Sequence, residues 1–270
     1  MTSFRPAAVA GTFYPADPRE LAAELSACLA QARGDPRKSP TPKAIIAPHA
    51  GFMYSGAVAG SIYARLAPLR GSVRRVVLAG PAHRVFVRGA AVPAAAIFGS
   101  PLGDVAIDAP ALEALRQLDF VDVSGEAHAR EHSLEVQLPF LQAVLGEFSL
   151  VPIVVGDASP EEAEALLEAV WGGDETLIVV SSDLSHYLPY EAARRRDRAT
   201  ADAILRLDAT LAPEDACGAA PINGLLRAAR HRALSVERVD LRNSGDTAGD
   251  RERVVGYGAF AFHAPARPDG

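Results

Sequence analysis

Two stretches of the chain repeat one pattern, in which a short apolar run is followed by a proline and then a histidine. Residues 44–47 are apolar and lead through Pro48 to His49, and residues 76–79 lead through a Gly-Pro pair to His83. A short apolar run predicts a buried strand. A proline ends its hydrogen-bond ladder, because proline has no amide hydrogen to donate. We therefore expect both histidines at the carboxyl end of a buried strand.

The rest of the chain alternates strand patterns with helix patterns. Such alternation predicts an α/β fold, with a mostly parallel twisted sheet and helices on both faces. We see no linker that divides the chain, so we expect a single domain over residues 1–270. The helix pattern of residues 131–145 contains Pro139, which predicts a kink or a late helix start. The connection between the last two expected strands, residues 236–241 and 254–262, is too short for an easy crossover, which favours an antiparallel pair.

Composition and motifs argue against several classes of function. The chain has 27 Lys and Arg residues against 33 Asp and Glu, a net charge of −6, which argues against a nucleic-acid partner. The sequence also lacks a Gly-x-x-x-x-Gly-Lys-Ser/Thr phosphate loop, a Gly-x-Ser-x-Gly elbow and paired Cys-x-x-Cys motifs. It offers no signature of a nucleotide phosphate site, an α/β-hydrolase or a structural zinc site.

The cysteines and the apolar pattern predict a location. Cys28 and Cys217 are the only cysteines and lie far apart in sequence, so we expect no disulfide and a reducing compartment. No run of about 18 apolar residues and no signal-peptide pattern is present, so we expect no membrane span. Together these features predict a cytoplasmic protein.

Four loops at the carboxyl ends of expected strands carry ionisable or polar groups. They contain His49, His83, the pair Asp183 and His186, and Asp246. In open α/β sheets, ligands bind in the crevice outside the carboxyl ends of the strands. Imidazole is the commonest protein ligand for transition metals, and two strand-end histidines can share one ion. A third ligand from the other loops would leave open positions, as metal-activated water or non-haem iron chemistry requires.

Each of these groups also has a structural interpretation. His186 and Asp183 could form a hydrogen-bonded helix cap, and residues 244–246 are an ordinary turn signal. His132 and Glu135 share a helix face at three-residue spacing. They could be metal ligands or support the ligands, and the alternative is a helix N-terminus whose acidic groups favour the dipole.

Several strings in the sequence resemble those of one protein family. They are Val-Ala-Gly-Thr-Phe-Tyr-Pro at 9–15, Pro-His-Ala-Gly at 48–51, Tyr-Ser-Gly at 54–56, Gly-Pro-x-His at 80–83, Glu-His-Ser-Leu-Glu-Val-Gln-Leu-Pro-Phe at 131–140, Ser-Ser-Asp-Leu-Ser-His at 181–186, Cys-Gly at 217–218, Pro-Ile at 221–222, Asn-Ser-Gly-Asp at 243–246 and Val-Val-Gly-Tyr at 254–257. This set resembles the Memo-like family, also called AmmeMemoRadiSam system protein B. The resemblance runs over nearly the whole chain, in order.

The resemblance implies a fold like that of the class III extradiol ring-cleaving dioxygenases. Those enzymes hold non-haem iron with two histidines and a carboxylate, and a further histidine acts as acid or base. By this likeness His49 and His83 are the imidazole ligands, and His186 is a ligand or the acid/base group. Some relatives carry a cysteine near the position of Thr247, and this chain does not. The family name also implies a pathway link to AMMECR-like and radical-SAM proteins.

The sequence thus predicts a metal-binding pocket acting on a small molecule that it does not identify. Iron(II) is the expected metal, with copper and zinc as alternatives. His49, His83 and His186 are the expected ligands, and His186 and Asp183 the expected catalytic groups. The supporting residues are Asp246, Ser244, Thr247, His132 and Glu135. Two other functions stay open: a non-catalytic adaptor module that binds a metal or a peptide, and a metal-dependent hydrolase.

Overall fold

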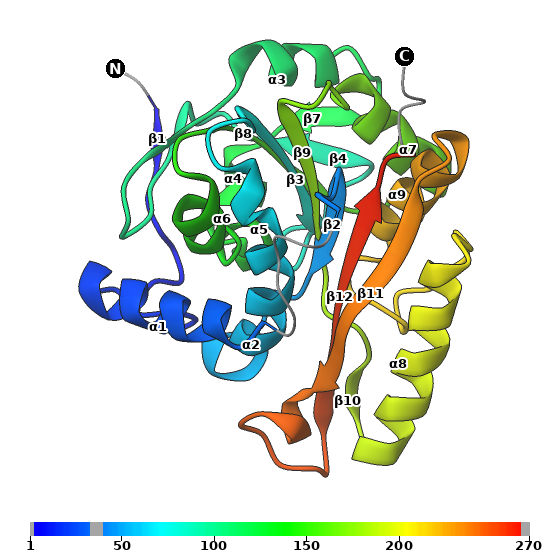
Figure 1. The fold of residues 1–270 in the computed structure, drawn as a ribbon. Helices are drawn as coiled ribbons and strands as arrows, with labels where there is room; N and C mark the ends of the chain where they lie inside the picture. The colour runs from blue at the N-terminus through cyan, green and yellow to red at the C-terminus, as the bar shows by residue number, and fades with distance from the viewer. Residues whose placement is uncertain (1–2, 33–39, 266–270) are drawn as a thin grey trace.

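A nine-stranded sheet forms the centre of the molecule (Figure 1), in a computed structural model that describes residues 3–32 and 40–265. Its strand order is β10-β12-β2-β9-β3-β8-β4-β7, and β11 pairs with β12. The strands are β2 (Ala44–Ala47), β3 (Arg75–Pro81), β4 (Ala90–Val92), β7 (Val121–Val123), β8 (Ser149–Val155), β9 (Thr176–Ser181), β10 (His186–Leu188), β11 (Ser235–Asn243) and β12 (Val254–His263). A separate three-stranded sheet contains β1 (Phe4–Arg5), β5 (Ile97–Phe98) and β6 (Val105–Ala106).

The four central strands β2, β9, β3 and β8 run parallel to one another. The sheet becomes mixed toward its margins, because β12 is antiparallel to β2 and β4 is antiparallel to β8. The expected antiparallel pairing of the last two strands, β11 and β12, is confirmed. The carboxyl ends of the central strands therefore meet at one edge, where parallel α/β sheets carry their ligand sites.

Helices cover both faces of this sheet, as expected for the α/β class. Alternate side chains of each buried strand point to opposite faces. Ile45 packs into the apolar core under α1 and α2, and Ile46 packs into the second core under α7 and α9. The helices are α1 (Pro18–Ala30), α2 (Phe52–Tyr63), α3 (Ala109–Leu115), α4 (Gly125–Ala129), α5 (His132–Glu135), α6 (Leu138–Leu145), α7 (Pro160–Ala169), α8 (Tyr190–Leu205) and α9 (Ala219–His231), with 3₁₀ turns η2 (Ala64–Leu69) and η3 (Ser244–Asp246).

The expected break near Pro139 is confirmed. The segment forms two helices, and Pro139 lies in the first turn of α6, where its missing amide hydrogen costs nothing. The first helix, α5, is a single turn capped by Glu131. No helix in the described ranges is long and apolar enough to cross a bilayer.

Candidate metal centre

His49 follows β2 after Pro48 and is buried, with 2% of its surface exposed. Its backbone N–H donates to Asp183 Oδ1 at 2.8 Å, and its ring Nδ1 lies 2.8 Å from Ser181 Oγ. The Ser181 hydroxyl has one hydrogen, which it donates to the Ser133 carbonyl at 2.5 Å. Its oxygen must therefore accept from His49, so Nδ1 carries the ring proton and Nε2 keeps a free lone pair. Gln137 donates to the same oxygen at 2.8 Å and fixes it in place.

His83 follows β3 and is held by one carboxylate. Glu131 accepts the His83 backbone N–H at 2.7 Å, and its other oxygen lies 3.0 Å from His83 Nδ1. Burial alone would raise the pKa of Glu131, but hydrogen bonds from His83 and Ser133 outweigh it and lower that pKa to about 2. An ionised carboxylate only accepts. His83 therefore donates through Nδ1 and presents Nε2, the arrangement that metal-binding histidines commonly show.

His132 opens α5, and its ring stacks on His83 with the centroids 4.6 Å apart. Phe13 contacts the same ring at 4.8 Å between centroids. The buried Nδ1 of His132 has no hydrogen-bond partner among the described residues and lies 3.4 Å from the carboxylate of Glu131. Burial lowers the pKa of His132 to about 4 and, with the neighbouring imidazoles, lowers that of His49 well below 6.5. Both rings are therefore neutral near pH 7.

The ligand atoms of His49, His83 and His132 lie within 4.8 Å of one another. The three residues differ in exposure: His49 is buried, and the side chains of His132 and His83 are 14% and 26% exposed. Neutral imidazoles are the form that binds metals, and the orphaned nitrogen of His132 is an unmet polar group in the same cluster. The residues therefore fit a transition-metal ion held by three histidines, a donor set that leaves at least one coordination position open.

His186 lies outside this group of three. It begins β10 and pairs with Val255, and burial lowers the pKa of its ring. It is near enough to His49 for a positive charge on His186 to lower the His49 pKa. Asp183 is buried and binds the backbone N–H groups of His49 and Ala50. Burial outweighs those hydrogen bonds and raises the pKa of Asp183 to about 7.

The loop that contains Asp246 forms a tight turn. Asp246 accepts from the Asn243 backbone at 3.1 Å and from the Tyr190 hydroxyl at 2.5 Å. Ser244 accepts from the backbone of β12, and Thr247 donates to the Ser244 carbonyl at 3.2 Å. These contacts hold η3 against α8 and β12, and the group of three histidines contains none of these side chains.

Glu135 is fully buried, and its carboxylate is not part of the group of three histidines. It binds Arg5 at 2.5 Å and accepts from the Tyr14 hydroxyl at 2.7 Å. The backbone N–H groups of Ala8 and Val9 also donate to its carboxylate. Glu135 therefore attaches the N-terminal segment to α5, directly behind His132.

Glu131, Ser181 and Gln137 were not among the site residues expected from the sequence. A signal for Glu131 was available, since it opens an unusually polar string at the head of an apolar helix. Ser181 lies within the polar stretch at the end of β9, but nothing in the sequence connects it with His49. Gln137 carries no comparable signal, because its role depends on the fold bringing the start of α6 against Pro48, which follows β2, and against Ser181 at the end of β9.

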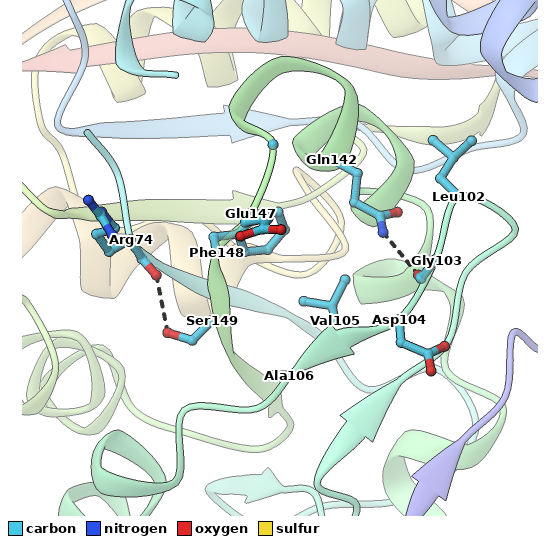
Figure 2. A pocket seen from close by; sticks show the side chains of 11 residues that line it. Arg74, Leu102, Gly103, Asp104, Val105, Ala106, Gln142, Glu147, Phe148 and Ser149 are labelled. Atoms are coloured by element: carbon cyan, nitrogen blue, oxygen red, sulfur yellow. Dashed lines mark hydrogen bonds between the residues drawn. The ribbon is translucent and has the colours of Figure 1, made fainter. Parts of the chain in front are cut away.

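The cavity of about 680 Å³ drawn in Figure 2 is a different feature. Arg74 and Ser149 line it where β3 and β8 begin, and Gln142 and Gly103 line its other side. His83 follows the opposite end of β3. This cavity therefore lies at the amino edge of the sheet, away from the histidines.

Two comparisons of the sequence with known proteins agree on one family. A family model described as Memo-like protein matches residues 5–261. A MEMO1 family protein of Sulfolobus acidocaldarius is 34% identical, covering 94% of this chain and 98% of the relative. One from Aquifex aeolicus is 37% identical, covering 96% and 98%. The solved structure of an uncharacterized protein from Escherichia coli K12 matches with a TM-score of 0.50 and 16% identity, over 79% of this chain and 98% of that one, a likeness of fold alone.

Proposed function

The chain belongs to the Memo-like protein family, and from this premise we propose that it is a metal-dependent enzyme with His49, His83 and His132 as its metal ligands. One observation carries the proposal: three histidines from separate segments bring their ligand nitrogens within 4.8 Å of one another at the carboxyl edge of the sheet. Hydrogen bonds to Ser181 and Glu131 use Nδ1 of His49 and His83, so that Nε2 of each ring keeps its lone pair.

We propose iron(II) as the resident metal and a dioxygenase-like oxidation of a small molecule as the reaction. Iron(II) with open positions supplies oxygen-activating redox chemistry. His186 stands at the edge of the centre, where its imidazole exchanges a proton with the substrate. Asp183 positions the His49 loop through the backbone and contributes no ligand atom to the group of three. The resemblance to ring-cleaving dioxygenases supports this choice of chemistry, and the pathway link to AMMECR-like and radical-SAM proteins stays a prediction.

A metal-dependent hydrolase is the second candidate, and the donor set favours it. The group contains three imidazoles and no carboxylate, whereas non-haem iron oxygenases commonly use two histidines and one carboxylate. Three histidines with an open position also suit zinc, which lowers the pKa of bound water to about 7. Copper and a non-catalytic adaptor role are further alternatives.

Metal content and gas binding distinguish these functions. Protein purified without oxygen is analysed for metals, loaded separately with iron(II) and zinc, and exposed to nitric oxide as an oxygen analogue. The oxidoreductase proposal expects one iron per chain and an iron–nitric oxide paramagnetic resonance signal, both lost in His49→Ala and His132→Ala. Metal retained in full by both variants contradicts the proposed ligands. A centre that takes up only zinc favours the hydrolase.

The matched control is His231→Ala. His231 is 65% exposed and lies on α9, so its loss leaves the metal content unchanged. For the wild-type chain, full iron occupancy without the iron–nitric oxide signal favours the non-catalytic adaptor role.

A further inference from the structure

Asp197 on α8 is a buried carboxylate to which the proposed function gives no role. Only 3% of its surface is exposed, and its Oδ1 accepts the Ser185 backbone N–H at 3.0 Å. Ser185 directly precedes His186 in the chain. Burying a charge is costly unless hydrogen bonds compensate it. The compensating donor here is the backbone of the loop that carries His186.

Gly256 on β12 fixes the same loop from a second side. Its N–H donates to the Ser185 carbonyl at 2.8 Å, and its carbonyl accepts from the Leu184 N–H at 2.8 Å. A side chain at position 256 would place its Cβ 2.2 Å from Asp197 Oδ2, a clash that only glycine avoids. The glycine of the Val-Val-Gly-Tyr string therefore leaves the space that the carboxylate occupies beside the loop.

One peptide group joins Asp197 to the ring of His186. The peptide group between Leu184 and Ser185 donates its N–H to Asp197 and offers its carbonyl to the His186 ring. Burial lowers the pKa of that ring, and the hydrogen bond to the carbonyl partly offsets the effect. Hydrogen bonds in a chain polarise one another, so a carboxylate on the N–H side makes the carbonyl a stronger acceptor.

We propose that Asp197 is a positioning residue for His186, and that it holds the imidazole in one neutral ring form through the peptide group between Leu184 and Ser185. The proposal rests on the proposed function, in which His186 exchanges a proton with the substrate. A ring N–H held on the Leu184 carbonyl leaves the other ring nitrogen as the site of that exchange. Asp197 lies outside the group of three histidines, so its removal should leave the ligand nitrogens in place.

NMR of metal-free protein labelled with nitrogen-15 in histidine tests this proposal, because the two neutral ring forms of a histidine give different nitrogen shifts. Wild type, Asp197→Asn and Asp197→Ala are compared near pH 8, and His186→Asn identifies the His186 signals. Burial raises the pKa of Asp197 to about 6, so the group is a carboxylate under these conditions. We expect one ring form in wild type and a mixture of both in the variants, with more of the second form in Asp197→Ala.

The Ser185 amide gives a second measurement. Its hydrogen exchange should be at least about fivefold faster in Asp197→Asn, because a hydrogen bond to a charged group is stronger than one to a neutral amide. Asp202→Asn is the matched control. Asp202 is exposed on the same helix, so both measurements in this variant should follow wild type.

Two outcomes overturn the proposal. Comparable amounts of both ring forms in wild type would show that nothing holds the ring. An unchanged single ring form in Asp197→Asn would remove Asp197 from this role even if the Ser185 amide exchanges faster, because the hydrogen bond would then have no effect on His186. Zinc binding by wild type is measured separately. A chain that binds no zinc contradicts the proposed metal-binding function, whereas the NMR comparison uses metal-free protein, so the two failures are distinguishable.

Discussion

At the scale of single residues, the Glu131 carboxylate lies against two of the three proposed metal ligands. It holds the backbone and ring of His83 and lies 3.4 Å from the ring of His132. We predict that Glu131→Gln lowers metal affinity by about 10- to 100-fold, because a neutral amide holds His83 less firmly and can donate where the carboxylate only accepts. Competition with a chelating dye measures the affinity.

Glu126→Gln is the control for this prediction. Glu126 is exposed on α4, close in sequence to Glu131, and the same change there leaves the affinity unaltered. Equal affinities for wild type and Glu131→Gln would show that His83 is held by other contacts.

His128 gives a prediction about pH. It is 2% exposed, its Nε2 bonds the Ala91 carbonyl at 2.9 Å, and burial lowers its pKa to about 4. The unfolded chain takes up this proton near pH 6.5 and the folded chain only near pH 4. Stability is therefore fully present above pH 6.5 and falls as the pH decreases toward 4, by at most about 3 kcal/mol from this residue.

Urea unfolding of metal-free protein at pH 7 and pH 5 measures this loss. His128→Gln keeps an amide donor for Ala91 and does not titrate, so its stability should fall less between the two pH values than that of wild type. The exposed His231 provides His231→Gln as the control, which should follow wild type. A parallel loss in His128→Gln and wild type would assign the acid sensitivity to other groups.

The sequence grouped the candidate site residues by local patterns, and the structure keeps one of these groups together and separates another. His49 and His83 were expected together because each follows a buried strand, and their ring centroids lie 5.3 Å apart. His132 was considered with Glu135 because three-residue spacing places two side chains on one helix face. The helix is only one turn long, so the structure sends Glu135 toward Arg5 while His132 stacks on His83.

At the scale of elements, α5 connects the candidate site to the N-terminal segment through the buried pair of Arg5 and Glu135. Glu135→Ala leaves Arg5 as an uncompensated buried charge, and we predict a loss of about 3–5 kcal/mol in the free energy of unfolding. Urea unfolding measures it, and the double variant with Arg5→Ala should lose less than the sum of the single losses.

Glu113 and Arg116 form the matched surface pair, at three-residue spacing on and just after α3. Both side chains are more than half exposed, so Glu113→Ala should lower the free energy of unfolding by less than about 1 kcal/mol. Additive losses for Arg5→Ala and Glu135→Ala would mean that the two side chains contribute separately.

At the scale of the whole molecule, the site depends on strand order, which local patterns do not contain. The sequence predicted an α/β sheet with histidines at strand ends, and the fold has that form. It did not show that β9 lies between β2 and β3, which is why Ser181 and Asp183 reach His49. The contact of Cys217 with His49 joins residues 168 positions apart, and such long-range contacts leave no periodic signal.

The same long-range assembly predicts that metal binding stabilises the folded chain. His49, His83 and His132 meet only after β2, β3 and α5 have packed together, so the unfolded chain offers no such site. A ligand that binds only the folded state stabilises it by about 2.7 kcal/mol at 100 times its dissociation constant. For a chain of this size, that corresponds to a rise in melting temperature of very roughly 5–10 °C. Thermal melting of chelator-treated protein, with and without added zinc, measures the shift.

His83→Ala should melt close to metal-free wild type yet show little shift with zinc. The His83 side chain is 26% exposed and lies outside the apolar core, so its removal disrupts little core packing. A zinc-dependent rise in melting temperature that is equal in His83→Ala and wild type would place the stabilising ion elsewhere on the molecule. A rise that occurs only in wild type would show that zinc stabilises the folded chain by binding these three imidazoles, because His83→Ala lacks one of the three proposed ligands and is otherwise unchanged.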